Sequence, residues 1–498
     1  MNKHLLTKAE KEFLFSPWTI AGFLASAAVA YFGSALLAKN TPAWWYHDSW
    51  PGSLSLREAL FYVSVFLLCL SWLRHALKLR RLVVTKSSVN EEASLRVRVI
   101  CFVIALWALP LVLGPSLFSQ DMYSYLAQGE LWRLGQNPYL SPPTTLLRFH
   151  QTSLLGAVSP FWRHTTSPYG PLFVAMAGYI YDVAGQNLTT AVILMRLAEC
   201  VGVALGGFFL IRLTGEDRQE ASLALWLGIG SPLVLFELIA AGHNDALMVG
   251  LVVLGIFLAK KNHLWWAFLI LGIAVMVKAP AALAALLIVA AVARSQIPKR
   301  KERIVALVGM DGVLLGALSA LLGVGLDWVS TNILSAPGKV HIATTLSVEL
   351  AFSFRDILSG LSSYFSFVHM SSLFSKINLA IFVLSIVYFV LKTRWDNLTH
   401  NLALLFIISV FLGPATWPWY FTWGIVFLVT QRHYLQSLVT PLAIMAISVL
   451  IKPNGILSIP SQYAPAVLAI LTILAVWHFY HSGIFGKRSF SRADITES

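Results

Sequence analysis

The sequence has little charge, few acidic residues and almost no cysteine. Only 12% of its 498 residues are charged, and 23 Asp and Glu stand against 36 Lys and Arg. The three cysteines, Cys69, Cys101 and Cys200, all lie in apolar stretches, without the spacing of a disulfide framework or a metal site. A Gly-rich nucleotide-binding loop is also missing. The composition therefore excludes a disulfide-stabilised secreted domain and gives no sign of a nucleotide site.

What the chain has in excess is hydrophobic residues. They make up 57% of the sequence, and the mean hydropathy is +0.72. Apolar runs of about 17–25 residues, the length that crosses a hydrocarbon core as a helix, recur along the whole chain. Lipid offers backbone groups no hydrogen-bonding partner, so helices rather than open sheets are expected. The sequence predicts an all-α polytopic membrane protein.

We expect about 14 transmembrane helices. Most of the Lys and Arg residues fall at one set of span ends, including the stretch 74–98 and the run Lys299 to Arg303. The positive-inside rule then places both termini in the cytoplasm. The net charge of +13 is thus a topology signal and does not indicate nucleic-acid binding. The expected spans are centred near residues 27, 68, 108, 200, 231, 252, 271, 287, 314, 385, 407, 424, 443 and 472.

Two long segments are predicted on the outer side, at residues 117–187 and about 326–375. Within the first, Tyr123 to Leu134 and Pro171 to Val183 are amphipathic and too short or too polar to span, so they suit the membrane interface. The first apolar segment lacks a small-residue cleavage site and is predicted to remain as a span. The expected division is an N-terminal tail and helical hairpin (1–96), a core with the outer loop 117–187 (97–325), and the second outer loop with C-terminal helices (326–498).

Asp121 stands out because acidic residues are rare near the outer face. It follows the third span in Ser119-Gln-Asp-Met-Tyr-Ser-Tyr125. A fixed, ionised carboxylate at this boundary can act as a general base toward a hydroxyl. It can equally cap a helix that starts at Met122. The two roles are compatible.

Two turn-rich motifs follow in the first outer segment. They are Leu134-Gly-Gln-Asn-Pro-Tyr139 and Ser167-Pro-Tyr-Gly-Pro-Leu172, in which Gly and Pro set the backbone angles. Tyr139 and Tyr169 are candidates for substrate binding. Tyrosines that anchor a protein at the membrane surface are the alternative explanation.

A second polar cluster, Ala241-Gly-His-Asn-Asp-Ala246, is predicted at the outer end of the fifth span. Its three polar residues can bind a polar head group or cap two helix ends. One His beside one Asp does not make a metal site. Lys278 lies at the junction of two apolar segments, where an unpaired ammonium costs free energy. Phosphate is its natural partner, and extension of the side chain to the membrane surface is the alternative.

Further candidates are weaker. Arg196 and Glu199, three residues apart on one helix, are expected to form a structural pair. In the second outer segment we single out His341, Arg355 and His369. The aromatic turn Gly413-Pro-Ala-Thr-Trp-Pro-Trp-Tyr420 brings Trp417, Trp419 and Tyr420, which can stack on a sugar or anchor the chain at the interface.

Five motifs, in this order and on one side, resemble those of the actinobacterial polyprenol-phosphate-mannose-dependent α-(1→6)-mannosyltransferases. The family belongs to the GT-C glycosyltransferases, which share a multi-span helical fold and use a lipid-phosphate sugar as donor. The resemblance covers residues 119–280, and the turn at 414–420 matches more loosely. It rests on Gln120-Asp-Met-Tyr-Ser-Tyr125, Asn137-Pro-Tyr139, Ser167-Pro-Tyr-Gly-Pro-Leu172, His243-Asn-Asp-Ala246 and Val277-Lys-Ala-Pro280.

The resemblance implies an inverting, metal-independent enzyme without a cofactor. Mannose would move from polyprenyl (decaprenyl) phosphate mannose to an α-(1→6)-mannan acceptor of lipomannan and lipoarabinomannan, or to a phosphatidylinositol mannoside. Asp121 would be the base, on the extracytoplasmic side of the plasma membrane, and Lys278 with Arg355 would stabilise the leaving phosphate. The implied donor- and acceptor-binding residues are Tyr123, Tyr125, Gln128, Asn137, Tyr139, Tyr169, His243, Asn244, Asp245, Lys278, His341, Arg355, Trp417 and Trp419.

Two other classes of protein would also have many spans. A lipid-linked sugar transporter or flippase predicts intramembrane charges near the midplane and internal repeats, and we find no convincing repeat. A non-catalytic assembly partner predicts that replacing Asp121 leaves activity unchanged. The collection of polar motifs on one face and in two outer loops favours the enzyme.

Overall fold

The computed structural model describes residues 6–34, 54–85, 97–215, 217–296, 298–330, 345, 350, 354, 367–413 and 415–451. This part of the chain is built of helices joined by turns and contains no β-strand, as the sequence predicts. The longer helices are α2 (Pro17–Ser34), α3 (Leu54–Val84), α4 (Val97–Leu113), α8 (Leu188–Leu213), α10 (Asp245–Lys260), α11 (Leu264–Val275), α12 (Ala282–Ala293), α13 (Arg300–Leu321), α16 (Phe367–Lys392), α17 (Leu398–Leu412) and α20 (Val439–Val449).

The shorter elements fill the connections between these helices. They are α1 (Lys8–Leu14), α5 (Asp121–Arg133), η2 (Pro143–Phe149), α6 (Thr152–Ala157), α7 (Pro171–Val183), α9 (Arg218–Gly228), the π-helix η3 (Val234–Ala240), η4 (Ala279–Ala281), α14 (Asp327–Val329), η8 (Pro418–Tyr420), α18 (Phe421–Leu428) and α19 (Arg432–Gln436).

Several helices have the length and composition to cross a membrane. Within the described residues these are α2 together with α1, α3, α8, α13 and α16, and a sixth span is possible if η3 and α10 form one bent crossing. Six further apolar helices have 10–17 residues. The chain is thus compatible with a multi-pass membrane protein. The count of fourteen stays a prediction, and the span expected near residue 472 lies outside the described residues.

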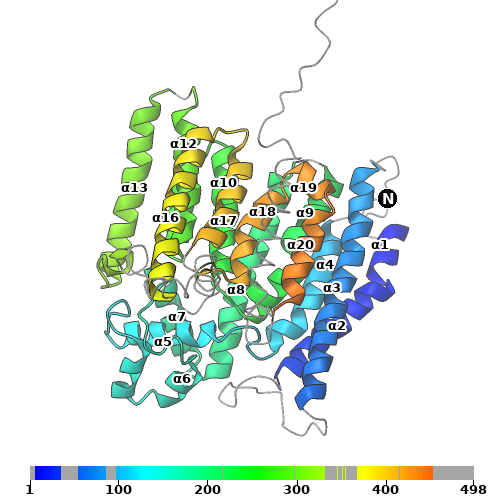
Figure 1. Cartoon of the computed structure of the whole chain (residues 1–498), viewed down its shortest axis with the longest axis horizontal. Coiled ribbons are helices and arrows are strands. Elements are labelled where there is room, and N and C mark those ends of the chain that lie inside the picture. The colour runs from blue at the N-terminus through cyan, green and yellow to red at the C-terminus, as the bar shows by residue number, and fades with distance from the viewer. Residues whose placement is uncertain are drawn as a thin grey trace, which may run out of the picture.

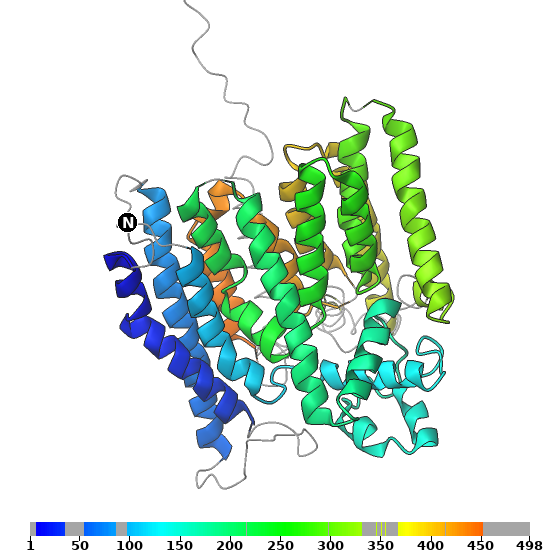
Figure 2. The same ribbon diagram turned by 180° about the vertical axis from the view of Figure 1, so that it is seen from behind.

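The long helices stand side by side, and α5, α6 and α7 lie across one end of them (Figure 1). The connections between α12 and α13 and between α16 and α17 lie at the opposite end, as the view from behind also shows (Figure 2). The basic run at the start of α13 and Lys392 at the end of α16 therefore lie far from α5. This arrangement separates the basic connections from the segment that carries Asp121.

The span predicted around residue 231 is not one straight helix. α9 ends at Gly228, and Gly230, Ser231 and Pro232 interrupt the helical hydrogen bonding before η3 begins. η3 and α10 then meet at an angle of 109°. The span expected near residue 231 is thus a broken segment, and whether it and α10 each cross the membrane stays a prediction. The bend between η3 and α10 places the polar residues 243–245 inside the fold.

The helix α5 is not a surface helix, contrary to the prediction for Tyr123 to Leu134. All residues from Asp121 to Leu131 are buried. A close crossing with α7 explains part of this burial, since a Cβ on Gly129 would lie 2.2 Å from the backbone nitrogen of Gly178. α7 itself is amphipathic, with Tyr179 and Val183 exposed. The chain thus buries one of its two predicted interfacial helices next to the site.

Arg196 on α8 does not pair with Glu199 as predicted. Its buried guanidinium donates to the carbonyl oxygens of Val112, Gly114 and Pro115 at the C-terminal end of α4 and just beyond it, and to that of Ala240 at the end of η3. Carbonyls at helix C-termini lack partners within the helix and favour a positive charge. Arg196 therefore joins two helix ends that flank the polar break.

We expect Arg196→Ala to lower the free energy of unfolding by about 3 kcal/mol or more, because several buried carbonyls would lose their donor at once. Thermal unfolding of the detergent-solubilised protein measures this loss. Arg212→Ala is the matched control, since Arg212 lies on the same helix but is exposed and donates only to Phe208. Equal unfolding temperatures for the two variants would contradict the role of Arg196.

Candidate active site

Asp121 is the first residue of α5 and is 8% exposed. Gln120 occupies the N-cap position, so the predicted capping by Asp121 is wrong. The carboxylate instead accepts a hydrogen bond of 2.9 Å from the indole nitrogen of Trp162, and the hydroxyl of Ser119 accepts from the Asp121 backbone at 3.0 Å. The bond from Trp162 orients the carboxylate, and the bond to Ser119 fixes the backbone at the start of the helix.

His243 lies against this carboxylate from the break between η3 and α10. Its Nε2 is 3.7 Å from Oδ2 of Asp121, and its ring is fully buried. Nδ1 lies 2.8 Å from the carbonyl oxygen of Glu237 and 3.3 Å from the Glu237 carboxylate. Since a carbonyl oxygen only accepts, Nδ1 carries the hydrogen. Nε2 is then the unprotonated nitrogen that faces Asp121.

Asp245 and Lys278 form a buried ion pair beside His243. Nζ of Lys278 is 2.6 Å from Oδ2 of Asp245, and the indole of Trp423 donates to Oδ1 of Asp245 at 2.5 Å. The ammonium also lies 4.8 Å from the ring centroid of Tyr420, a distance suited to a cation–π interaction. Lys278 is thus paired and held inside the site, rather than unpaired or turned to the surface.

Backbone contacts bring the turn-rich motifs to the same place. The backbone nitrogen of Gly170 donates to the carbonyl of Val277 at 3.0 Å, and a Cβ on Gly170 would lie 2.0 Å from the carbonyl oxygen of Met276. Only glycine allows this approach. The hydroxyl of Tyr139 donates to the carbonyl of Tyr169 at 2.9 Å. The motif with Tyr169 therefore connects the motif with Tyr139 to the turn that carries Lys278.

Residues 415–420 of the aromatic turn close the site from the C-terminal half. Trp419 stacks on His243 with ring centroids 3.7 Å apart, and Trp417 stacks on Trp419 at 5.0 Å. Trp419 is buried and Trp417 is half-buried. The looser motif of the sequence thus meets the others in space, and it holds the imidazole ring from one face.

The remaining candidates lie around this centre. Tyr125 is buried and packs edge-on against Tyr169 at 4.8 Å. Gln128 and Asn244 are buried, and Oε1 of Gln128 and both amide atoms of Asn244 have no hydrogen-bond partner. Asn137 accepts from the backbone of Tyr139 and donates to Asp327, so its amide joins the two outer segments. His341 and Arg355 lie outside the described residues.

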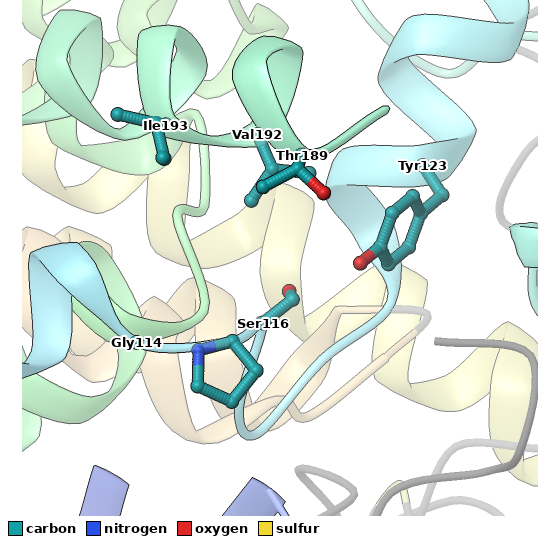
Figure 3. Close-up of a pocket in the computed structure, with 7 residues that line it drawn as sticks. Gly114, Ser116, Tyr123, Thr189, Val192 and Ile193 are labelled. Atoms are coloured by element: carbon teal, nitrogen blue, oxygen red, sulfur yellow. The ribbon is translucent and has the colours of Figure 1, made fainter. Parts of the chain in front are cut away.

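Tyr123 points away from Asp121. It lines a small pocket between the loop Gly114–Ser116 and Thr189, Val192 and Ile193 of α8, as Figure 3 shows. Consecutive positions of a helix face different sides, which separates Tyr123 from the carboxylate two residues before it. Its predicted binding role, like those of Asn137 and Tyr139, stays a prediction.

Sequence reasoning missed three side chains of the site. Trp162 and Trp423 donate to the carboxylates of Asp121 and Asp245, and nothing in their own sequence neighbourhoods marks them. Glu237 is different, because it is a single carboxylate within the apolar run before His243. An ionisable residue in such a run indicates function by default, and this signal could have found it.

Burial raises the pKa of Asp121 to about 6. The nearby Lys278 ammonium and the hydrogen bonds from Trp162 and Ser119 act in the opposite direction, and the Asp245 carboxylate adds to the rise. A carboxyl group with a pKa close to 6 is ionised at neutral pH and still binds a proton well. This combination suits a general base. The described residues contain no group of three or more His, Cys, Asp or Glu that could hold a metal ion.

Comparison with known proteins identifies the family of the chain. The family model described as "Alpha-(1->6)-mannopyranosyltransferase, N-terminal domain" matches residues 19–294, more than half of the sequence. The chain belongs to this mannosyltransferase family. The family predicted from the motifs is confirmed. The matched region holds the ionisable residues of the site, Asp121, Glu237, His243, Asp245 and Lys278, whereas the aromatic residues 417–423 lie outside it.

Individual relatives extend the similarity beyond that region. The chain is 29% identical to an α-(1→6)-mannopyranosyltransferase A of Mycobacterium tuberculosis over 82% of its own length and 78% of that protein. It is 25% identical to an α-(1→6)-mannopyranosyltransferase B of Corynebacterium glutamicum over 80% of its length and 71% of that protein. The family likeness therefore includes most of the chain in both cases.

Proposed function

We propose that this protein is an inverting α-(1→6)-mannosyltransferase that takes mannose from polyprenyl phosphate mannose. The observation that carries the proposal is the meeting of one carboxylate, Asp121, and one cation, Lys278, in a single buried site. The names of the family and of the relatives supply the sugar and the linkage. The acceptor is the α-(1→6)-mannan backbone of lipomannan and lipoarabinomannan, with a phosphatidylinositol mannoside as the smaller alternative.

Asp121 is the general base in this proposal. It removes the proton of the acceptor's primary hydroxyl while the oxygen attacks the anomeric carbon. The carrier phosphate leaves with the bonding electrons, and inversion of the β-linked donor produces an α-mannoside. A phosphodiester leaves as a stable anion, so this step needs no acid. Lys278 stabilises the charge that develops on the phosphate, and it does so without a metal ion.

The aromatic side chains suit a sugar substrate. Trp417 is only half-buried and stacks on Trp419, so one of its faces is available next to the charged groups. The unpartnered amide of Asn244 and the unpartnered Oε1 of Gln128 are suited to sugar hydroxyls. Arg355 and His341 are proposed to assist from the second outer segment.

We further propose that the site faces the outside of the plasma membrane and that both termini are cytoplasmic. The separation of α5–α7 from the basic α12–α13 and α16–α17 connections supports this orientation (Figure 1). A lipid-linked donor and a growing outer glycan would then reach the same side of the protein.

Purified protein with radiolabelled polyprenyl phosphate mannose and a short α-(1→6)-mannoside tests the proposal. The expected product carries one additional α-(1→6)-linked mannose, and its yield is the same with EDTA. Loss of transfer on adding EDTA would overturn the metal-free mechanism. Movement of the donor across vesicles without product would favour the flippase.

The transfer rate should depend on pH through Asp121. Because the base must be ionised and its pKa is about 6, kcat/KM is expected to fall about tenfold per pH unit below 6 and to level off above it. Initial rates between pH 4.5 and 8, with folding checked at each pH, measure this profile. A rate that stays constant down to pH 5 would exclude a base with this pKa.

A further inference from the structure

Glu237 is a buried carboxylate that the mechanism above does not use. It lies in the π-helix η3, an unusual element that is often found at functional sites. Its side chain is 0% exposed, and neither carboxylate oxygen has a hydrogen-bond partner. Nδ1 of His243 lies 3.3 Å from Oε2 of Glu237. Burying a carboxylate without a hydrogen-bond partner lowers the stability of the fold by several kcal/mol, so we expect this residue to have a function.

Both the backbone carbonyl and the side chain of Glu237 contact His243. The Glu237 carbonyl accepts from the His243 backbone nitrogen at 3.3 Å and from Nδ1 at 2.8 Å. The carboxylate lies 3.3 Å from the same Nδ1. Trp419 covers the ring face at 3.7 Å. The imidazole is thus fixed in plane and in tautomer, with Nε2 toward Asp121.

His243 and Asp121 face each other with two hydrogen-bond acceptors, and a single proton between them can bind to both. Nε2 has a free electron pair and no hydrogen-bond partner, and it faces Oδ2 of Asp121 at 3.7 Å. Two acceptors that face each other attract a shared proton. Catalytic hydrogen bonds are often long without substrate and shorten in the reactive complex.

We propose that His243 receives the proton that Asp121 removes from the acceptor, and that Glu237 is the positioning residue that orients His243 and stabilises its protonated form. This inference rests on the proposed transferase function. The acceptor O–H bond breaks as the new glycosidic bond forms, and the proton passes to Oδ2 of Asp121 and then to Nε2 of His243. The carrier phosphate keeps the electrons of the broken bond. The arrangement follows the logic by which a carboxylate supports a catalytic imidazole.

Other ionisable groups surround this relay. Lys278 faces both His243 and Asp121, and its charge opposes protonation of either. The Asp245 carboxylate acts on Asp121 in the opposite sense. The remaining groups on the packed elements are Glu199 and Arg196 on α8 and the phenols of Tyr125, Tyr169 and Tyr420.

Glu237→Gln in the full-length purified protein tests the relay. We expect kcat to fall on the order of 10- to 100-fold with the donor KM little changed, as for an outer partner of a functional imidazole. Without the negative charge, the Asp121–His243 pair binds its proton less tightly. The acid limb of the pH profile should therefore move about one unit to lower pH. Glu237→Asp keeps the charge and should restore the limb.

Glu199→Gln is the matched control, because Glu199 is equally buried but accepts from the Leu247 backbone and has no contact with His243. Its acid limb should stay in place. A wild-type kcat and an unmoved limb in Glu237→Gln would overturn the relay. If Glu237→Gln does not fold, His243→Gln decides, since loss of the imidazole must also move the limb to lower pH.

An infrared titration separates this inference from the proposed function. The carboxylic acid band that disappears in Asp121→Asn reports protonation of Asp121 without any turnover. Its midpoint should be lower in Glu237→Gln and in His243→Gln than in the wild type, and unchanged in Glu199→Gln. An unchanged midpoint refutes the shared proton even if mannose is transferred. Absence of transfer by the wild type refutes only the function.

Discussion

Asp121→Asn is expected to lower the rate of mannosyl transfer by a factor on the order of 10²–10⁴, the contribution of a general base. Asparagine keeps the size of the side chain and can still accept from Trp162, so the fold should survive. The loss should appear in kcat, because the carboxylate acts on the proton of the acceptor as the bond forms. Single-turnover transfer from polyprenyl phosphate mannose measures this step directly.

Asp182→Asn is the control for this substitution. Asp182 belongs to the same outer segment, but its side chain is 53% exposed and pairs only with Arg133 at the surface. An exposed ion pair of this kind contributes little to the stability of the fold, so the Asp182→Asn control should keep nearly full activity. If Asp121→Asn were as active as Asp182→Asn, Asp121 would be a structural residue and the non-catalytic partner would become the better explanation.

Lys278→Met is expected to have two effects that a second substitution can separate. The first is a loss of stability of about 3–5 kcal/mol, because Asp245 would remain buried with an unpaired charge. The second is weaker use of the donor, since the leaving phosphate would lose its cation. Adding Asp245→Asn removes the unpaired charge. The double variant should therefore recover most of the stability but none of the donor use.

Thermal unfolding and the donor KM of the three variants, Lys278→Met, Asp245→Asn and the double variant, complete this cycle. The donor KM should rise about tenfold or more in both variants without the lysine. Recovery of the donor KM together with the stability would mean that Lys278 acts only through the fold. The phosphate site would then have to lie elsewhere, with Arg355 as the next candidate.

Much of the architecture could be predicted because the solvent imposes it. A chain of this hydropathy has to satisfy its backbone within helices, and every apolar run within the described residues does form helix or broken helix. The fifth span is the exception, because Gly230 and Pro232 interrupt it. These helix-breaking residues were visible in the sequence, but the separate bend of 109° between η3 and α10, at residues 241–244, was not predicted.

The candidate site was partly predictable for a similar reason. Asp121, His243, Asp245 and Lys278 are polar residues at places where apolar runs end, and such residues are too expensive to be there by chance. Their partners were assigned less well. Lys278 pairs with Asp245 across 33 positions, and Arg196 bonds to carbonyls near residues 114 and 240 instead of to Glu199. Sequence proximity favours neighbours on one helix, whereas burial selects whichever partner the packing supplies.

The sequence by itself determined that this protein is helical and rich in apolar spans, and that its chemistry gathers in a few polar motifs that match one mannosyltransferase family. Hydropathy and motif order are properties of the chain that need no coordinates. Only the tertiary structure decided that motifs spread over residues 120–280 come together near Asp121, and that Glu237 contacts the far side of the His243 ring. Hydrogen bonds and ion pairs depend on distances of a few ångströms, and only packing sets those distances.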